Sequence, residues 1–185
     1  SATVTLSDDT VYEAKLVGAD ALSDIAVLKI EASGLTAAAF GESGNLAVGD
    51  RVAAIGNPLG EEFRSTLTDG IISAIERGIN YNGHSMTLLQ TNTALNEGNS
   101  GGALFNMYGQ VVVVTNMKMM SSYSSIEGIG FAIPSATAQN VVNALCTDGE
   151  VRGRSSIGIT VGAIPENAAS HYELPEGLYV SAVVE

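Results

Sequence analysis

Apolar and β-branched residues recur along the chain in short runs, and each run is cut by Gly, Asn, Asp or Ser. Runs of this length and composition are typical of β-strands. We expect strands at residues 2–6, 10–17, 25–30, 51–55, 66–75, 86–90, 103–105, 111–117 and 130–133. The turn residues Ser7, Asp8 and Asp9 predict a hairpin between the first two runs. Because almost no helix separates the strands, the pattern predicts an all-β sandwich or barrel and argues against alternating strands and helices.

One helix is expected after Pro134, with Ser135 as its N-cap. The apolar positions of this segment fall on one helical face: Ala138, Val141, Val142 and Leu145. Residues 148–156 are polar and contain glycine, which predicts a linker. The organisation expected is therefore one domain over residues 1–147, the linker, and the beginning of a second module over residues 157–185.

The composition of the chain excludes several classes of binding partner. Eight basic and 20 acidic residues among 185 give a net charge of −12. Nucleic-acid binding needs a basic surface that displaces phosphate counterions, so nucleic acids and anionic membrane surfaces are excluded as partners. No apolar run approaches the roughly 20 residues that span a bilayer. The single cysteine, Cys146, lies in an apolar run and is expected to be a buried, inert thiol.

The strongest chemical signal is EGNSGG at residues 97–102, where Ser100 is flanked by glycines between two predicted strands. Small neighbours allow a tight turn that exposes a serine hydroxyl beside backbone N–H groups, which is the arrangement a nucleophilic serine needs. An ordinary glycine-rich turn is the plainer alternative. Asp24 directly precedes another predicted strand, where a carboxylate can orient an imidazole. Alone, Asp24 would more simply be a surface residue at the end of a turn.

Taken in order, SDIAVLKI, FGESGNLAVGDRVAAIGNPLG, TDGIISAIERG, QTNTALNEGNSGGALFN and IEGIGFAIPS resemble the protease domain of the HtrA/DegP serine endopeptidases. The resemblance implies a chymotrypsin-like double β-barrel, with its first barrel incomplete, and one C-terminal helix. The tail RGRSSIGI and GLYVSAVVE resembles the start of the PDZ domain that follows the protease in that family.

The same resemblance implies roles for individual residues. Ser100 would be the nucleophile and Asp24 the residue that orients the histidine. The oxyanion hole would be formed by Gly98, Asn99 and Ser100, with the N–H groups of Gly98 and Ser100 as its donors. A second set would bind the substrate, through backbone pairing and an apolar specificity pocket: Ile129, Gly130, Phe131 and Met119.

The triad histidine is missing from the expected place. In the family it precedes the aspartate by about thirty positions, and only 23 residues stand before Asp24, none of them His. We therefore expect this histidine upstream of Ser1, together with any targeting sequence or membrane anchor, and we expect the chain as given to be inactive. The chain order Asp24, His84, Ser100 is that of subtilisin-like enzymes, but His84 lies in a polar turn stretch and is interpreted as an exposed loop residue. His171 belongs to the partial second module and is not expected to reach Ser100. Neither histidine has a second His, Cys or carboxylate at the spacing of metal ligands.

Two further features complete the sequence expectations. Where the family often has QTDAAINPGNSGG, this chain has Asn92, Thr93 and Glu97, and Glu97 places a negative charge beside the predicted oxyanion hole. Residues 59–66 and 121–125 are candidate gating loops by resemblance. The function implied is a cofactor-free serine endopeptidase for unfolded or misfolded proteins, located outside the bacterial inner membrane. The resemblance also implies a homotrimer for the full-length protein. The alternative is an inactive protease fold that binds peptides through its PDZ domain.

Overall fold

The computed structural model describes residues 2–81, 84–96, 98–116, 128–153, 158–163 and 178–183. The chain divides into two compact units, Ser1–Val151 and Arg152–Glu185. The division falls within the stretch that the sequence predicts as a linker.

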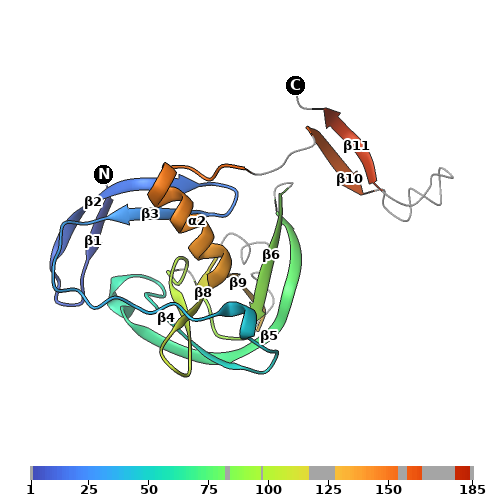
Figure 1. The fold of residues 1–185 in the computed structure, drawn as a ribbon. Helices are drawn as coiled ribbons and strands as arrows, with labels where there is room; N and C mark the ends of the chain where they lie inside the picture. The colour runs from blue at the N-terminus through green and yellow to red at the C-terminus, as the bar shows by residue number, and fades with distance from the viewer. Residues whose placement is uncertain are drawn as a thin grey trace. The chain divides into compact units, whose positions relative to one another are not determined.

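A closed barrel dominates the first unit (Figure 1). Its strands are β4 (Arg51–Gly56), β5 (Thr66–Tyr81), β6 (His84–Thr91), β7 (Ala103–Asn106), β8 (Val111–Thr115) and β9 (Gly130–Pro134). They follow the order β4-β5-β6-β9-β8-β7, and every pairing is antiparallel. The barrel architecture predicted from the strand pattern is therefore confirmed.

A separate antiparallel sheet precedes the barrel in the chain. It consists of β1 (Ala2–Thr5), β2 (Val11–Asp20) and β3 (Ile25–Lys29). Thr5 pairs with Val11, and the Thr10 N–H donates to Asp8 Oδ1 at 3.0 Å, which closes the predicted hairpin. Short 3₁₀ helices η1 (Ser43–Asn45) and η2 (Glu61–Phe63) interrupt the connections around β4.

Helix α2 (Ser135–Asp148) packs against β2 and β3 of this sheet and against β8 and β9 of the barrel. Its buried face includes Ala138, Val141 and Leu145, as the apolar spacing predicts. The helix ends at Gly149, whose left-handed backbone (φ 76°) lets its N–H donate to the Leu145 carbonyl oxygen. Cys146 is exposed, so the expectation of a buried thiol is wrong. It follows Leu145, and one helical step of about 100° turns it away from the buried row.

The expected N-cap is also wrong. Pro134 holds the cap position, and Ser135 is the first helical residue, fully buried. The Ser135 hydroxyl donates to the Gly41 carbonyl oxygen at 2.7 Å, and Ser43 Oγ accepts from the Ala136 N–H at 3.1 Å. A serine 93 positions earlier in the chain therefore supplies the side-chain acceptor that Ser135 was expected to provide.

Two apolar clusters form the core of the first unit. One fills the barrel: Val52, Ala54, Ile72, Leu89, Leu95, Leu104, Val112, Val113 and Ala132. The other consists of Leu88, Phe131, Ile133 and Ala138, with Ile25 of β3 packed against it. Strand β8 is buried along nearly its whole length. Helix α2 contacts this strand, and Val112 and Val113 of the strand belong to the cluster that fills the barrel.

The second unit contains one described antiparallel pair, β10 (Ile159–Ala163) and β11 (Leu178–Val183), with a register shift between Thr160 and Val161. These strands fall within the apolar runs expected there. Within the described parts of the chain, no helix has the length and apolar character needed to cross a membrane.

Candidate active site

Ser100 lies in the loop between β6 and β7, and its side chain is exposed. The loop has a left-handed backbone on both sides of Ser100, with φ 96° at Gly98 and φ 78° at Gly101. Glycine adopts such angles without steric cost. A Cβ atom at position 98 would lie 1.9 Å from the Asn57 carbonyl oxygen, so the end of β4 leaves room only for glycine there. The requirement for glycine before Ser100 is therefore both conformational and steric.

Thr115, the last residue of β8, holds this loop through four hydrogen bonds. Its backbone N–H donates to the Gly102 carbonyl oxygen at 2.9 Å, and its carbonyl oxygen accepts from the Gly101 N–H at 3.0 Å. Its hydroxyl, on a side chain only 3% exposed, donates to the carbonyl oxygens of Asn99 and Gly102. Residues on both sides of Ser100 are thus fixed to one barrel strand.

Asn99 is buried directly beside the exposed Ser100. Its N–H donates to the Asn96 carbonyl oxygen at 3.0 Å, and its carbonyl oxygen accepts from the Gly102 N–H at 2.9 Å. Its side-chain Oδ1 has no hydrogen-bond partner among the described residues, and a Cβ atom at Gly56 would lie 2.2 Å from it. The burial of Asn99 against β4 turns Ser100 outward. Glu97 lies outside the described residues.

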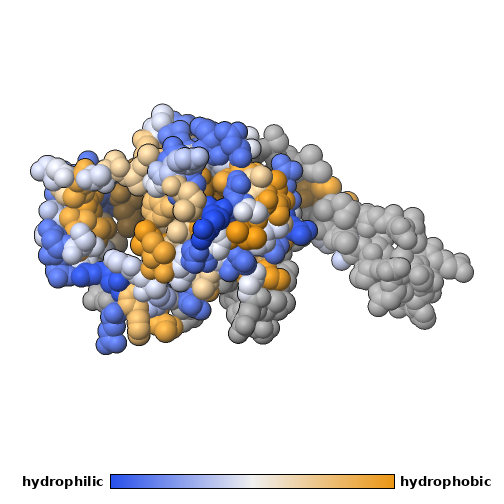
Figure 2. Space-filling model, turned by 90° about the horizontal axis from the view of Figure 1, so that it is seen from below, coloured by the Kyte–Doolittle hydropathy of each residue, from blue (hydrophilic) through white to orange (hydrophobic). Residues whose placement is uncertain are grey.

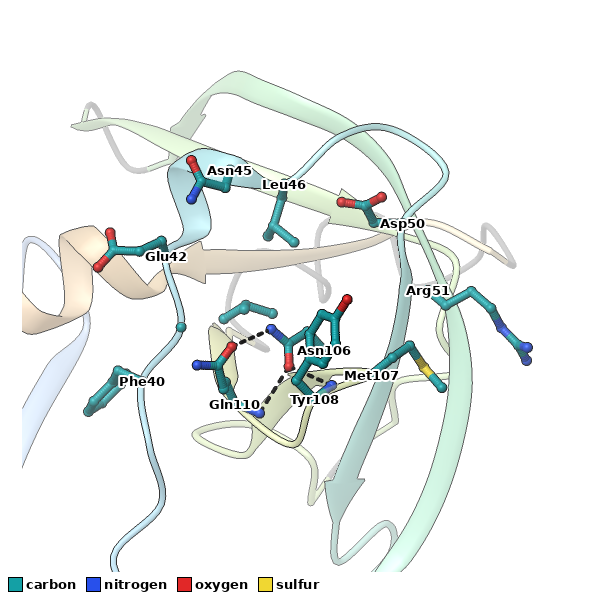
Figure 3. A pocket seen from close by; sticks show the side chains of 12 residues that line it. Phe40, Glu42, Asn45, Leu46, Asp50, Arg51, Asn106, Met107, Tyr108 and Gln110 are labelled. Carbon is teal, nitrogen blue, oxygen red and sulfur yellow. Dashed lines mark hydrogen bonds between the residues drawn. The ribbon is translucent and has the colours of Figure 1, made fainter.

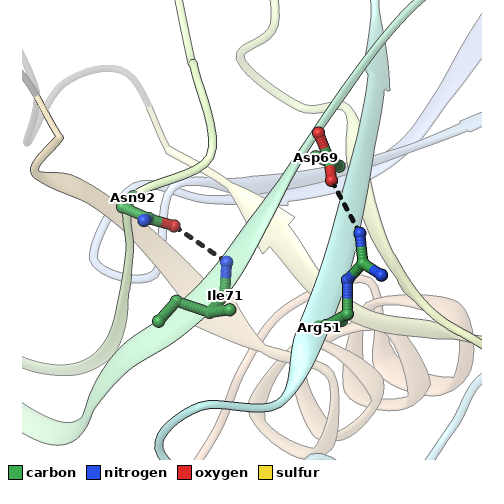
Figure 4. A network of polar contacts seen from close by, with 4 residues as sticks. All are labelled: Arg51, Asp69, Ile71 and Asn92. Carbon is green, nitrogen blue, oxygen red and sulfur yellow. Dashed lines mark hydrogen bonds and ion pairs between the residues drawn. The ribbon is translucent and has the colours of Figure 1, made fainter.

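The segment before the nucleophile loop is fixed to β5. Asn92 Oδ1 accepts from the Ile71 N–H at 2.8 Å (Figure 4). The Thr68 hydroxyl donates to the Ala94 carbonyl oxygen at 2.9 Å, and the side chain of Leu95 enters the barrel core. Asn92, one of the departures from the family pattern, therefore has a structural role on the neighbouring strand.

The expected substrate-binding strand is β9 with the residue before it. Gly130 is buried, and a Cβ atom there would lie 3.0 Å from Leu95 Cδ1, so the loop before the nucleophile contacts this strand. Phe131 is 5% exposed in the second core cluster, and its carbonyl oxygen accepts from the Asn116 N–H at 3.4 Å. Ile129 is half-buried against the same cluster. Met119 lies outside the described residues.

Asp24 occupies the tight turn that enters β3, with a left-handed backbone at φ 57°. The turn is closed by Asp20, whose Oδ2 accepts from the N–H of Ser23 at 2.9 Å and from its hydroxyl. The next residue, Ile25, packs against the cluster that contains Phe131. Asp24 is thus tied, through its neighbour, to the core beneath the expected substrate strand.

Of the two histidines, only His84 lies among the described residues. His84 opens β6 opposite Tyr81, whereas the nucleophile loop follows the other end of that strand, at Thr91. The seven steps of extended strand from His84 to Thr91 span about 23 Å. His171 lies outside the described residues.

Sequence reasoning missed the contacts made by Thr115, Gly56 and Asn57. One signal for Thr115 was present: it is the polar end of the apolar run VVVVT, and a hydroxyl at such a position needs a buried partner. Gly56 and Asn57 follow a predicted strand, and nothing in the sequence indicates that Asn99 and Gly98 pack against them.

A barrel that presents an exposed serine in a glycine-flanked loop is the arrangement of chymotrypsin-like serine peptidases. The trypsin-like peptidase domain family matches residues 1–114. The chain therefore belongs to the trypsin-like peptidase family.

Similar proteins carry HtrA and DegP names. "Serine protease Do-like HtrA" of Lactobacillus helveticus is 42% identical over 191 residues, covering 97% of this chain and 46% of the relative. "Probable periplasmic serine endoprotease DegP-like" of Chlamydia trachomatis is 42% identical over 184 residues, covering 98% of this chain and 36% of the relative. The solved structure "HtrA-type protease AlgW with decapeptide" is 37% identical with a TM-score of 0.82, covering 99% of this chain and 56% of that one. The chain thus spans about half or less of the length of these curated relatives.

Proposed function

We propose that this chain carries the nucleophile and the acid of a serine endopeptidase of the HtrA/DegP type. The observation that supports the proposal most strongly is the loop around Ser100, where two left-handed glycines and the Thr115 hydrogen bonds present an exposed hydroxyl next to rigid backbone. The names of the relatives, which are serine proteases, support the same reaction.

The proposed reaction is acyl transfer in two steps. Ser100 Oγ attacks the carbonyl carbon of the scissile peptide bond and gives its proton to an imidazole. The tetrahedral intermediate then releases the amine, which takes that proton, and leaves an acyl ester on Ser100. Water, deprotonated by the same imidazole, hydrolyses the ester and restores the serine.

The N–H groups of Gly98 and Ser100 are the proposed donors to the oxyanion. The Asn99 N–H already donates to Asn96, so its part is to hold the loop. Donors fixed before the reaction stabilise the developing negative charge without reorganisation. We assign Asp24 to the imidazole, whose N–H it would accept. The imidazole itself is proposed to come from a histidine outside these 185 residues, because neither His84 nor His171 is a supported candidate.

The proposed substrates are unfolded or misfolded proteins. Backbone groups at Ile129 and Gly130 would pair with an extended peptide, and an apolar pocket lined by Ile129 and Met119 would select small or medium aliphatic side chains. Two solved relatives are described as bound to a decapeptide and a tripeptide, which supports an extended peptide as ligand.

The location, further domain and assembly of the full-length protein are also proposals. Relatives in three Chlamydia species are named periplasmic endoproteases, which supports a location outside the inner membrane. Residues 157–185 are proposed to begin a PDZ domain. A homotrimer and a membrane anchor upstream of Ser1 remain part of the proposal through family resemblance.

Cleavage of unfolded casein by the full-length gene product tests the enzyme assignment. The wild-type protein should cleave it, and Ser100→Ala should abolish cleavage without loss of the folded barrel, as followed by circular dichroism. Undiminished cleavage by the variant would exclude Ser100 as nucleophile. A wild-type protein that binds peptides and never cleaves them would instead be the inactive peptide-binding form of this fold.

A further inference from the structure

Strand β4 has different surroundings at its two ends. Its start borders a pocket of about 650 Å³ (Figure 3). Two of the lining residues, Phe40 and Glu42, turn their side chains away from this pocket in Figure 3, so the lining does not converge on one ligand group. The other end of the strand, at Gly56, leads into residues 57–66, next to the loop that carries Ser100. The contacts that bear on the proposed reaction lie at this second end.

Asn57 directly follows β4 and approaches Gly98 with both of its peptide groups. Its N–H donates to the Gly98 carbonyl oxygen at 3.4 Å. Its carbonyl oxygen lies 1.9 Å from the point that a Cβ atom at Gly98 would occupy. The N–H of Gly98 is one of the two proposed oxyanion donors. A shift of the Asn57 backbone would therefore displace a donor of the proposed oxyanion hole.

The side chain of Asn57 closes the loop that follows it. Its Oδ1 accepts from the Ser65 N–H at 3.1 Å, and its carbonyl oxygen accepts from the Gly60 N–H at 3.2 Å. Leu59 and Ser65 both have a left-handed backbone, at φ 63° and φ 61°, which is costly for residues other than glycine. Such a conformation persists only where surrounding contacts hold it. The bond to Asn57 Oδ1 is therefore one of the contacts that keep Ser65 in this conformation.

Burial contributes little to holding the loop after Asn57. Leu59 is 75% exposed and Phe63 51%. Figure 2 shows apolar residues separated by polar ones over the face that it presents, so exposed apolar side chains are ordinary on this surface. Arg64 pairs with Asp9 at 2.7 Å, but the Asp9 side chain is 76% exposed, and exposed ion pairs stabilise little. Hydrogen bonds are therefore the main restraint on this loop, and two of them end on Asn57.

We propose that Asn57 is a positioning residue for the oxyanion hole. By accepting the Ser65 N–H, its side chain holds its own peptide groups against Gly98 and so fixes the direction of the Gly98 N–H. This inference rests on the proposed peptidase function, in which that N–H stabilises the oxyanion. Oxyanion donors are effective because they are fixed before the reaction begins. Without the side-chain bond, Leu59 and Ser65 can relax toward ordinary backbone angles, and the contact with Gly98 loosens.

Casein cleavage by the full-length gene product tests the proposal. Asn57→Ala should lower kcat by about tenfold with little change in KM, because a misplaced oxyanion donor affects the transition state and not the bound substrate. Asn57→Asp keeps an acceptor for the Ser65 N–H and should restore the rate to within about threefold of the wild-type rate. The matched control is Ser65→Ala, which keeps the N–H donor and should cleave as the wild-type protein does. Equal rates for the alanine and aspartate variants of Asn57, or an equal loss in Ser65→Ala, would overturn the proposal.

Amide hydrogen exchange, read by mass spectrometry, tests the same proposal without any need for activity. In the full-length Ser100→Ala protein, Asn57→Ala should speed exchange of residues 98–102 by about tenfold and leave exchange of α2 unchanged. That segment includes the hydrogen-bonded N–H groups of Asn99, Gly101 and Gly102. Unchanged exchange of residues 98–102, or an equal rise in α2, would overturn the proposal. If the wild-type protein cleaves no casein, the peptidase assignment fails, and the exchange result still decides whether Asn57 holds this loop.

Discussion

At the scale of single residues, Thr115 contacts the nucleophile loop on both sides of Ser100. Its hydroxyl donates to the carbonyl oxygens of Asn99 and Gly102, on either side of the nucleophile. Each of these oxygens also accepts a backbone N–H, from Gly102 and Thr115 respectively. Removal of the hydroxyl therefore leaves neither oxygen without a partner, and its main effect should be on the position of the loop.

Thr115→Val is expected to lower kcat by about 10- to 100-fold, because small displacements of a nucleophile are costly, while KM changes little. Thr115→Ser keeps the hydroxyl and should restore most of the rate. Casein cleavage by the full-length protein gives both constants, and urea unfolding should show a loss of about 1–2 kcal/mol for the valine variant. Equal rates for the valine and serine variants would show that the hydroxyl does not position Ser100.

A second residue-scale prediction compares two glycines of the same loop. Both have positive φ, but a Cβ atom at Gly98 would lie 1.9 Å from the Asn57 carbonyl oxygen, whereas at Gly101 it would meet nothing within 4 Å. Gly101→Ala should cost only the backbone term of about 1–2 kcal/mol. Gly98→Ala should cost more and abolish reaction at Ser100.

Urea unfolding and the rate of labelling by a fluorophosphonate measure these two effects separately. Similar losses in both variants would mean that the approach of Asn57 does not restrict the loop.

How far the sequence predicts the site depends on the range of each contact. The glycines beside Ser100 and the strand that follows Asp24 are local features, so the pattern of residues 97–102 and 24–30 identifies them directly. The partners of the loop come from β4 and β8, which only the closed barrel brings to it. The prediction of Ser135 as the N-cap was wrong for the same reason. Its hydroxyl donates to the carbonyl oxygen of Gly41, which is 94 positions away in the sequence.

At the scale of elements, α2 joins the sheet that carries Asp24 to the barrel that carries Ser100. Strand β2 approaches the end of this helix closely at Gly18, where a Cβ atom would lie 2.8 Å from the Gly149 carbonyl oxygen and 3.1 Å from Leu145 Cδ2. The strand positions themselves were predictable because each buried run is contiguous in the sequence. This close approach of strand and helix was not, because its two sides are more than a hundred residues apart.

Gly18→Ala should therefore push β2 away from α2 and destabilise the protein by about 1–3 kcal/mol. Gly78→Ala is the matched control, because Gly78 also lies in a strand and a Cβ atom there would meet nothing within 4 Å. Urea unfolding of both variants tests this contact. A Gly78 variant as unstable as the Gly18 variant would contradict it.

At the scale of the whole molecule, the first unit unites the two candidate catalytic residues, and the second is a separate compact body. Contacts with β8 and with the end of β4 position the loop that carries Ser100. The turn into β3 positions Asp24, and the second core cluster brings its neighbour Ile25 into contact with the cluster that contains Phe131. The proposed function therefore requires that Ser100 is an activated nucleophile in the intact protein.

Labelling of the full-length gene product with a fluorophosphonate probe tests this requirement, when the modified residue is identified by mass spectrometry. We expect modification of Ser100 and its loss in the Ser100→Ala variant, because a base in the intact protein activates this hydroxyl. A folded protein that remains unlabelled at Ser100, even with a peptide ligand present, would contradict it.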